Sequence, residues 1–461
     1  MSTKHAKAAE KFLQDPVRAA WHDETLWIVR AKRDKMSKEV PEWEALREKA
    51  CELKLYSNSH LEELLTEFEK NATANGAIVH WAKDAEEYRA IVYEILKSHD
   101  VKRFVKSKSM LAEECELNPF LTEQGIDVVE SDLGERILQL MHLPPSHIVL
   151  PAIHIKREQV GKLFETEMGT EKGNSDPTYL TYAARKNLRN IFLHAEAAMT
   201  GANFAVASTG DIVVCTNEGN ADMGTSCTTL NIAAFGIEKI VPDIPSLGVF
   251  IRLLARSATG QPVTTYTSHY RKPRDGGEYH IIIVDNGRSK MLGMADHIKT
   301  LNCIRCGACM NTCPVYRRSG GYSYTYFIPG PIGINLGMAH DPEKYYDNLS
   351  ACSLCISCSE VCPVKIDLAE QIYRWRQKLD SIGKADTGKK VISGGMKVLM
   401  NHPPLFNAAL WASPVVNHLP RFIKYNDLDD WGKGRELPEF AGESFNSMWK
   451  KNKVQGKEDT K

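Results

Sequence analysis

The feature that most constrains this chain is a pair of cysteine runs with the same spacing. The first is Cys303-Ile-Arg-Cys306-Gly-Ala-Cys309-Met-Asn-Thr-Cys313-Pro314, and the second is Cys352-Ser-Leu-Cys355-Ile-Ser-Cys358-Ser-Glu-Val-Cys362-Pro363. Both have the spacing C-x2-C-x2-C-x3-C-P that is typical of [4Fe–4S] ligation, in which the fourth cysteine binds the other cluster. The spacing therefore predicts cluster I at Cys303, Cys306, Cys309 and Cys362, and cluster II at Cys352, Cys355, Cys358 and Cys313.

The alternative for these cysteines is a pair of structural zinc sites, or simply buried thiols. Zinc sites generally use paired C-x2-C knuckles, and two complete four-cysteine runs fit that pattern poorly. Eight of the 12 cysteines fall between Cys303 and Cys362, and a cytosolic protein has little use for disulfides. We therefore favour iron–sulfur clusters over zinc, and two adjacent clusters favour an electron relay over a purely structural or sensing role.

Composition and charge exclude several other functions. The 461 residues carry 58 basic and 58 acidic side chains, so the chain lacks the basic excess of a typical nucleic-acid binder. No apolar run reaches the ~18 residues of a transmembrane helix, and the charged N-terminus has no signal-peptide pattern. We expect a cytosolic protein with no nucleic-acid partner and no transmembrane segment.

Hydrophobic patterning divides the chain into four regions. Residues 1–75 are charged and have helical spacing over Trp43–Phe68, with a break at Asn58-Ser59. Residues 76–295 alternate short apolar runs with helical segments such as Tyr182–Met199, which predicts an α/β domain with a largely parallel sheet. Residues 296–383 hold the cysteine runs and a predicted helix over Asp367–Leu379, and residues 384–461 form an irregular extension whose last dozen residues we expect to be disordered. The runs expected as strands are Arg103–Val105, Ile126–Val129, His147–Leu150, Phe204–Ala207, Ile212–Val214, Ile240–Val241 and Ile281–Val284.

Polar loops after the predicted strands form a candidate anion pocket. Ligands of open α/β sheets bind near the carboxyl ends of the strands, where backbone N–H groups with a lysine and an arginine suit a carboxylate or a phosphate. The simpler interpretation of Ser208-Thr-Gly210 and Asp285-Asn-Gly287 is an ordinary turn. The candidate pocket residues are Lys106, Lys108, Ser109, Thr209, Gly210, Asn286 and Arg288.

The remaining candidates are weaker. His147 and His154 are either ligands or buried histidines with satisfied hydrogen bonds, the commoner case. No glycine spacing matches a dinucleotide site, so we expect no NAD or flavin site in this chain. Because nearby charge tunes cluster potentials, Arg305 is expected to raise the potential of cluster I and Glu360 to lower that of cluster II.

The chain as a whole resembles a known family, the iron–sulfur B subunit of the three-component bacterial lactate-utilisation system. Many ferredoxin-like proteins share the cysteine runs, so other segments carry the resemblance. These segments are Lys106-Ser-Lys-Ser-Met110, Ser131-Asp-Leu-Gly-Glu135, Pro145-Ser-His-Ile148 with Pro151 and His154, Ser208-Thr-Gly210, Asp285-Asn-Gly-Arg288, Gly320-Gly-Tyr322, Tyr326-Phe-Ile-Pro-Gly-Pro-Ile-Gly333, Trp431-Gly-Lys-Gly-Arg-Glu-Leu-Pro438 and Glu443-Ser-Phe445.

The resemblance implies an α/β LUD domain, similar in fold to ribose-5-phosphate isomerase and CoA transferases, followed by an α-helical ferredoxin domain with two [4Fe–4S] clusters. It implies an electron-transfer subunit of a complex that oxidises L-lactate to pyruvate, with a cysteine-rich A subunit and a LUD-containing C subunit as partners. The implied location is the cytoplasm, with any attachment to the inner membrane made through those partners. Two alternatives stay open: a redox- or iron-responsive binding protein, and a self-sufficient oxidoreductase with its substrate in the LUD pocket. No residue is assigned a catalytic role.

Overall fold

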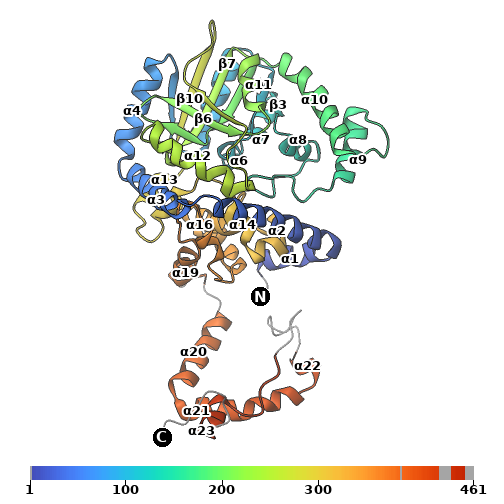
Figure 1. The fold of residues 1–461 in the computed structure, drawn as a ribbon, viewed down its shortest axis with the longest axis vertical. Helices are drawn as coiled ribbons and strands as arrows, with labels where there is room; N and C mark the ends of the chain where they lie inside the picture. Colours follow the sequence, from blue (N-terminus) through green and yellow to red (C-terminus); the bar gives the residue numbers. More distant parts are fainter. Residues whose placement is uncertain (1–2, 380, 385–386, 425–437, 452–461) are drawn as a thin grey trace. The chain divides into compact units, whose positions relative to one another are not determined.

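The structure of the chain, a computed structural model, describes residues 3–379, 381–384, 387–424 and 438–451. Residues 4–377 form one compact unit, and residues 378–461 form a second together with the first three residues. Figure 1 colours both units along the sequence, from blue to red. Most of the tail segment Trp431–Pro438 and the expected disordered end from position 452 onwards lie outside the described residues.

A six-stranded parallel sheet lies at the centre of the larger unit. Its strand order is β1-β10-β7-β4-β2-β3, and each neighbouring pair is parallel. Strands β4 and β7 are buried along their whole length, as both faces of a parallel sheet are covered by other elements. This sheet confirms the predicted α/β class. The strands are β1 Ile78–Ala82, β2 Arg103–Lys106, β3 Asp127–Glu130, β4 Ala197–Gly201, β7 Leu230–Gly236 and β10 Glu278–Val284.

Helices cover both faces of this sheet with apolar side chains. On one face α5 (Ala85–Ser98), α6 (Met110–Glu114) and α7 (Leu117–Glu123) bury residues such as Tyr88 and Leu121 against Phe104. On the other face α4 (Leu61–Ala74) packs Phe68 against Phe235 of β7. The remaining helices of the α/β region are α8 Leu133–Leu140, α9 Arg157–Met168, α10 Pro177–Leu193, α11 Asn220–Cys227, α12 Ile244–Thr259 and α13 Arg288–Leu292.

A second sheet of four strands, in the order β8-β5-β6-β9, adjoins the core around α4. Strands β5 and β6 form an antiparallel hairpin whose turn contains Gly210. Gly210 has φ +72°, and a Cβ there would lie 2.4 Å from the backbone N of Ala72 in α4, so only glycine fits this turn. The strands are β5 Phe204–Val206, β6 Asp211–Thr216, β8 Ile240–Val241 and β9 Tyr266–Tyr270.

Two local predictions are wrong. The run His147–Leu150 is not a strand, because the His147 ring accepts hydrogen bonds from the N–H groups of Val149 and Leu150, both at 3.0 Å, and holds the run as a loop. The helix predicted over Tyr182–Met199 ends at Leu193, because residues 197–201 enter the sheet as β4 between β2 and β7.

The N-terminal helices pack on the cysteine-bearing region. They are α1 (Lys4–Leu13), α2 (Pro16–Lys38) and α3 (Trp43–Ser59). The break between α3 and α4 falls at His60, just after the predicted Asn58-Ser59, which are the last residues of α3. In Figure 1 the dark blue α1 and α2 run alongside the yellow and orange cysteine region, and α2 contacts α14 (Ala308–Thr312) and α15 (Pro314–Ser319). The His22 ring bonds the Arg317 carbonyl at 2.8 Å, and the Arg317 guanidinium donates to Asp23 at 2.6 Å.

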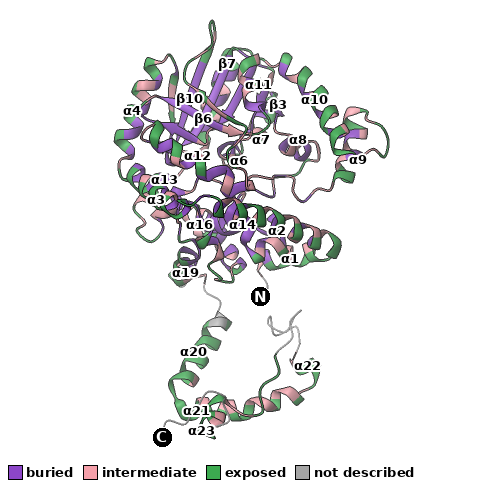
Figure 2. Ribbon diagram, in the orientation of Figure 1, coloured by how far each residue is buried: buried purple, intermediate pink, exposed green. Residues whose placement is uncertain are grey.

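Short helices and loops hold the cysteine runs. Helix α16 is buried nearly all round, and Figure 2 shows this region mostly in purple. A Cβ at Gly333 would lie 1.7 Å from the Ile328 carbonyl oxygen, so α16 depends on glycine to pack against its own preceding loop. The helices are α14 Ala308–Thr312, α15 Pro314–Ser319, α16 Gly330–His340, α17 Pro342–Tyr345, α18 Ser357–Glu360 and α19 Leu368–Lys378, with 3-10 turns η1 Ile237–Lys239, η2 Ile298–Asn302, η3 Gly321–Ser323 and η4 Tyr346–Ala351.

The smaller unit consists of short helices with exposed apolar side chains. Its helices are α20 (Thr387–Asn401), α21 (Pro403–Ala412), η5 (Ser413–His418), α22 (Arg421–Lys424) and α23 (Phe445–Lys450). Trp411 of α21 is 85% exposed and Phe422 of α22 is 73% exposed, and Figure 2 shows these helices mainly in green and pink. Among the helices that the structure describes, none is both long enough and apolar enough to cross a membrane.

Candidate metal centres and an adjoining cavity

Three cysteines of the first run and the last cysteine of the second line one small hollow. They are Cys303, Cys306, Cys309 and Cys362. The rest of the wall is apolar, with Ile148 from the loop before α9 among its residues. The other wall residues include Ile304, Ile332, Val364, Ile366 and Leu368.

The complementary four cysteines line a second hollow. They are Cys352, Cys355, Cys358 and Cys313. Its wall is completed by Pro331, Ile334, Ala351, Ile356 and Ala369. The two hollows are neighbours. Pro331 lines the second hollow and the adjacent Ile332 lines the first. In addition, the hydroxyl oxygens of Thr312 in the first run and Ser357 in the second lie 2.6 Å apart.

The two runs share the same backbone conformation. Arg305 and Leu354 occupy the same place in their runs and have φ +61° and +54°, and Gly307 and Ile356 correspond in the same way with φ +75° and +58°. In this left-handed conformation, the backbone N–H of the third residue of each run donates a hydrogen bond to the Sγ of the first cysteine. The N–H of Arg305 donates to Cys303 Sγ at 3.4 Å, and that of Leu354 donates to Cys352 Sγ at 3.3 Å.

The donor chemistry of both hollows fits iron–sulfur clusters. Burial raises the pKa of the Cys313 thiol to about 11 and that of the Cys362 thiol to about 12. Such a thiol becomes a thiolate only where a bound cation replaces its proton, and four soft thiolates with N–H bonds to sulfur suit iron–sulfur clusters. When bound, a cluster at each hollow would supply one-electron redox chemistry.

Buried guanidinium groups surround the first hollow. Arg47 of α3 donates from Nε to the Cys362 carbonyl at 3.0 Å, and Arg33 of α2 donates from Nη2 to the Val361 carbonyl at 3.0 Å. The Arg305 side chain, 9% exposed, reaches Glu238 at 3.4 Å. Arg33 and Arg47 pair with Asp34 and Glu44, whose side chains are 34% and 66% exposed against 9% and 10% for the two arginines. Water therefore screens these carboxylates more than the guanidinium groups, and net positive charge is buried beside the four cysteines.

The second hollow is closer to the surface. Cys355 is exposed, and the Ile356 side chain next to it is 54% exposed. One guanidinium is close by, that of Arg376 in α19, which donates from Nη2 to the Cys352 carbonyl at 2.5 Å and to the Leu349 carbonyl at 2.7 Å. The side chain of Glu360 is exposed, so water screens its charge.

A cavity of about 260 Å³ lies at the carboxyl edge of the parallel sheet and extends to the first cysteine run. Loops after β2, β4 and β7 form its walls, and α12 closes one side. Cys306 and Arg305 line it as well as Lys239, which ends the 3-10 turn after β7. The cavity therefore joins the α/β region to the hollow lined by Cys306.

The candidate anion-pocket residues are only partly brought together. Lys108, Ser109 and Arg288 line this cavity. Lys106 is fully buried away from it, with its Nζ 2.8 Å from Glu130 Oε1.

The other three candidates lie elsewhere. Thr209 and Gly210 form the hairpin turn against α4, where Asn75 donates to the Thr209 carbonyl at 2.8 Å. Asn286 lines a second cavity of about 310 Å³ and donates to Glu114 Oε1 at 2.7 Å. Lys239 and Arg305, which line the first cavity, were not among the candidates.

An ion-pair network separates the two cavities. Arg288 Nη2 lies 2.8 Å from Glu114 Oε2, and Arg288 Nε lies 2.5 Å from Glu238 Oε2. Burial alone would raise the pKa of Glu238, but Arg288, Lys239 and Arg305 hold it at about 2. Burial and the neighbouring Arg305 charge together lower the pKa of Lys239 to about 8, although Glu238 opposes them. Positive charge thus exceeds negative charge at this end of the cavity.

His147 and His154 have their ring nitrogens occupied. His147 Nδ1 accepts two amide hydrogen bonds, so its Nε2 carries the proton and donates to Asn311 Oδ1 at 2.9 Å. His154 pairs with the Ser146 hydroxyl at 2.6 Å and the Tyr322 hydroxyl at 2.8 Å. Burial lowers the pKa of both rings to about 3. Both histidines therefore act as neutral links between the α/β region and the cysteine region.

Comparisons with known proteins agree with this architecture. Residues 65–290 match the LUD domain model, and residues 299–366 match the 4Fe-4S dicluster domain model. The fold and the matched domains define an iron–sulfur protein in which a LUD domain precedes a 4Fe-4S dicluster domain.

Curated relatives match almost the full chain. Lactate utilization protein B of Bacillus pumilus is 39% identical over 433 residues, covering 91% of this chain and 91% of its own. The same-named protein of Shouchella clausii is 37% identical over 469 residues, with 98% of each chain covered. An uncharacterized electron transport protein, YkgF, of Escherichia coli is 38% identical over 459 residues, covering 97% and 96%. The chain belongs to the lactate utilization protein B family.

Proposed function

We propose that this chain is an electron-transfer subunit that relays electrons through two [4Fe–4S] clusters during the oxidation of L-lactate to pyruvate. Cluster I is held by Cys303, Cys306, Cys309 and Cys362, and cluster II by Cys352, Cys355, Cys358 and Cys313. The observation that carries the proposal is the crossed grouping of the cysteines, in which each hollow takes three thiols from one run and the fourth from the other. The lactate assignment comes from the names of the relatives.

The surroundings of the two hollows support a direction for the relay. The hollow of cluster I borders the α/β cavity through Cys306, and the hollow of cluster II borders the surface through Cys355. Electrons would enter on the cavity side, pass between neighbouring clusters, and leave where cluster II is exposed. The partners in this proposal are a cysteine-rich A subunit and a LUD-containing C subunit, in the cytoplasm, with any inner-membrane contact made through them.

Metal analysis of anaerobically purified protein tests the cofactor. We expect about eight irons and about eight acid-labile sulfides per chain, the content of two [4Fe–4S] clusters. Two zinc ions with negligible iron and sulfide would overturn the proposal, and four irons would leave room for one cluster only.

Reconstitution tests the role. Lactate and an artificial acceptor should give turnover only when the A and C subunits are present. Reduction that changes the oligomeric state, without turnover in the complete mixture, would instead identify a redox-responsive binding protein.

A second candidate function has its own supporting observation. The cavity reaches Cys306, so a substrate bound there would lie next to cluster I without the help of another subunit. This arrangement favours a self-sufficient oxidoreductase. Turnover of lactate by the purified chain alone, with an artificial acceptor, would establish it, and a need for partners would exclude it.

A further inference from the structure

The inner end of the 260 Å³ cavity carries cationic side chains that its own carboxylates do not neutralise. The Glu238 carboxylate already pairs with Arg288 and Arg305, and the backbone carbonyl of Glu238 accepts a hydrogen bond from the Lys54 ammonium. Glu114 is held by Arg288. Within the described residues, no hydrogen-bond acceptor pairs with the Lys239 ammonium, and Arg305 Nη1 is buried without a partner.

These cations face the cavity as well as the cluster. Lys239 and Arg305 line the cavity, and neither is among the residues that line the cluster I hollow. A cluster would balance part of their charge, but neither side chain lines the hollow that would hold its sulfur atoms. Arg305 Nη1 is a buried donor without an acceptor, which is costly, so a ligand that brings a carboxylate would be favoured there.

The rest of the cavity suits a small organic anion. Lys108 adds a third cation, with its Nζ held by the Val149 carbonyl at 3.0 Å and no carboxylate attached to it. Apolar and small side chains of α12, among them Leu254 and Ala258, form the opposite wall. Two further carboxylates line the cavity: Glu218 is exposed, so its charge is screened by water, and Asp132 caps α8 by accepting a hydrogen bond from the Glu135 N–H at 2.9 Å.

We propose that this cavity binds a small carboxylate of the 2-hydroxy or 2-oxo acid class, with the carboxylate between Lys239 and Arg305 and next to Cys306. The position of cluster I in this proposal rests on the proposed function above. A bound anion adds negative charge beside cluster I and not beside cluster II. Binding should therefore change the spectrum of one cluster selectively.

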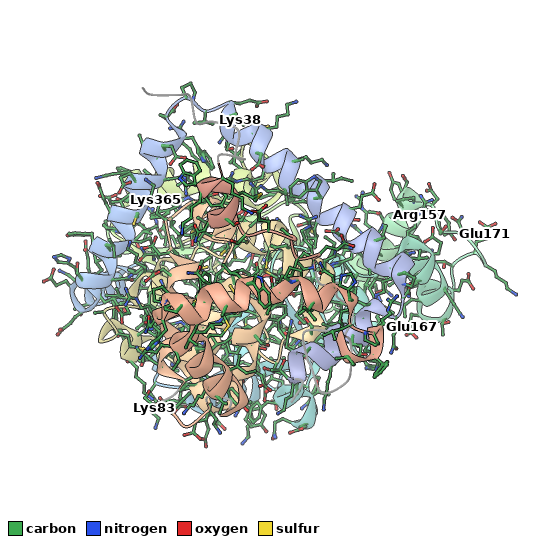
Figure 3. The ribbon with its side chains drawn as sticks, turned by 90° about the horizontal axis from the view of Figure 1, so that it is seen from below. Lys38, Lys83, Arg157, Glu167, Glu171 and Lys365 are labelled. Atoms are coloured by element: carbon green, nitrogen blue, oxygen red, sulfur yellow. The ribbon has the colours of Figure 1, made fainter. Side chains whose placement is uncertain are left out.

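Titration calorimetry on the intact cluster-loaded chain tests the site, with L-lactate and pyruvate as ligands and lactamide as the uncharged analogue. We expect the two acids to bind and lactamide not to bind. Lys239→Met should weaken acid binding tenfold or more, because a charge-assisted hydrogen bond is lost. The matched control is Lys83→Met, since Lys83 (labelled in Figure 3) lines the other cavity, and acid binding should be unchanged there.

Electron paramagnetic resonance of the reduced protein gives the second readout. Pyruvate should shift the signal of one cluster, and Lys239→Gln should abolish that shift while iron content and unfolding midpoint stay unchanged. Equal acid affinity in the wild-type chain and both Lys239 variants would overturn the inference, as would no acid binding by a chain with a full iron content. A chain that binds the acids through Lys239 but contains zinc would overturn the proposed function and leave this site intact.

Discussion

The two cluster hollows are built on the same backbone and placed in opposite surroundings. Each run has left-handed residues at the same two positions and a backbone N–H donated to its first cysteine sulfur. Around cluster I, however, Arg33, Arg47 and Arg305 are buried, whereas around cluster II the Cys355 thiol is exposed. The cysteine spacing thus determines the backbone conformation around each proposed cluster, whereas residues far away in the sequence determine the charge and the solvent exposure around it.

In the proposed relay, this difference would give the two clusters separate tasks. Buried positive charge stabilises the more negative, reduced form of a cluster, so cluster I should have the higher midpoint potential, and the step from cluster I to cluster II would be uphill and driven by the external acceptor. Exposure shortens the path to an external redox partner, which suits cluster II for exchange with another subunit. The predictions below test first the grouping of ligands and then the surroundings that distinguish the two centres.

The largest expected effect comes from removing ligands in pairs. If the cysteines are grouped across the runs, the double variant Cys306→Ser/Cys362→Ser damages one cluster and should keep about four irons. The variant Cys306→Ser/Cys313→Ser damages both clusters and should keep almost no iron. Iron analysis and electron paramagnetic resonance measure the result. The opposite ranking of the two variants would mean that each run binds its own cluster.

Acidification should weaken the cluster I side through His147. Burial lowers the pKa of His147 from 6.5 to about 3, and its ring contacts Asn311 in the first run. Below pH 6.5 the unfolded chain binds a proton that the folded chain does not bind. The stability contribution is therefore complete above pH 6.5 and falls by up to about 1.4 kcal/mol per pH unit as the pH drops towards 3.

Urea unfolding between pH 7 and pH 5 measures this effect. The variant His147→Gln should be less stable at pH 7 but should lose about 2 kcal/mol less than wild type on going to pH 5. The exposed His194→Gln variant is the control and should follow the wild-type profile. A His147→Gln profile parallel to that of wild type would show that His147 is not buried in its neutral form.

The next effect concerns the potential of cluster I. Arg47→Met removes a buried charge whose guanidinium donates to the Cys362 carbonyl. One charge at an effective dielectric constant near 20 contributes on the order of 1–2 kcal/mol, so the midpoint of cluster I should fall by roughly 50–90 mV. A spectroscopic redox titration measures both midpoints, and iron content checks that the cluster is retained.

Arg374→Met is the matched control for Arg47→Met. Arg374 lies on the exposed side of α19, where it pairs with Glu370 at 2.8 Å, and its charge is screened by water. Its removal should leave both midpoints unchanged. Indistinguishable midpoints of the two clusters in the wild-type chain would contradict the assignment of unequal surroundings.

The cysteine spacing predicts which four cysteines line each hollow, but it does not predict the cavity. Lys239 follows β7, whose residues Leu230–Gly236 include an asparagine, two alanines and a single β-branched residue, a weak strand pattern. Arg305 contributes through Glu238, which is distant in sequence. Thr209 and Gly210 follow a strand as expected, but that strand belongs to the small sheet, so their turn faces α4 and not the cavity.

The smallest expected effect concerns the left-handed position that both runs share, which is Ile356 in one run and Gly307 in the other. Ile356 holds φ +58°, where a β-branched residue is strained, whereas Gly307 at φ +75° in the corresponding place is not. Ile356→Gly should stabilise the chain by about 1 kcal/mol, since relief of roughly 1–3 kcal/mol of strain exceeds the added freedom of the unfolded chain. The Ile356 side chain is 54% exposed, so little apolar burial is lost.

Gly307→Ala is the reverse experiment on cluster I. It imposes a Cβ on a left-handed residue and places that atom 3.1 Å from His147 Cε1, so it should destabilise the chain by about 1–2 kcal/mol. Urea unfolding followed by the visible absorbance of the clusters measures both variants. The changes in the free energy of unfolding should have opposite signs, because both runs have the same left-handed backbone at this position but one has isoleucine there and the other has glycine. Destabilisation by Ile356→Gly would mean that the exposed isoleucine packs on cluster II, and that the surface exit of the relay is more enclosed than its accessibility indicates.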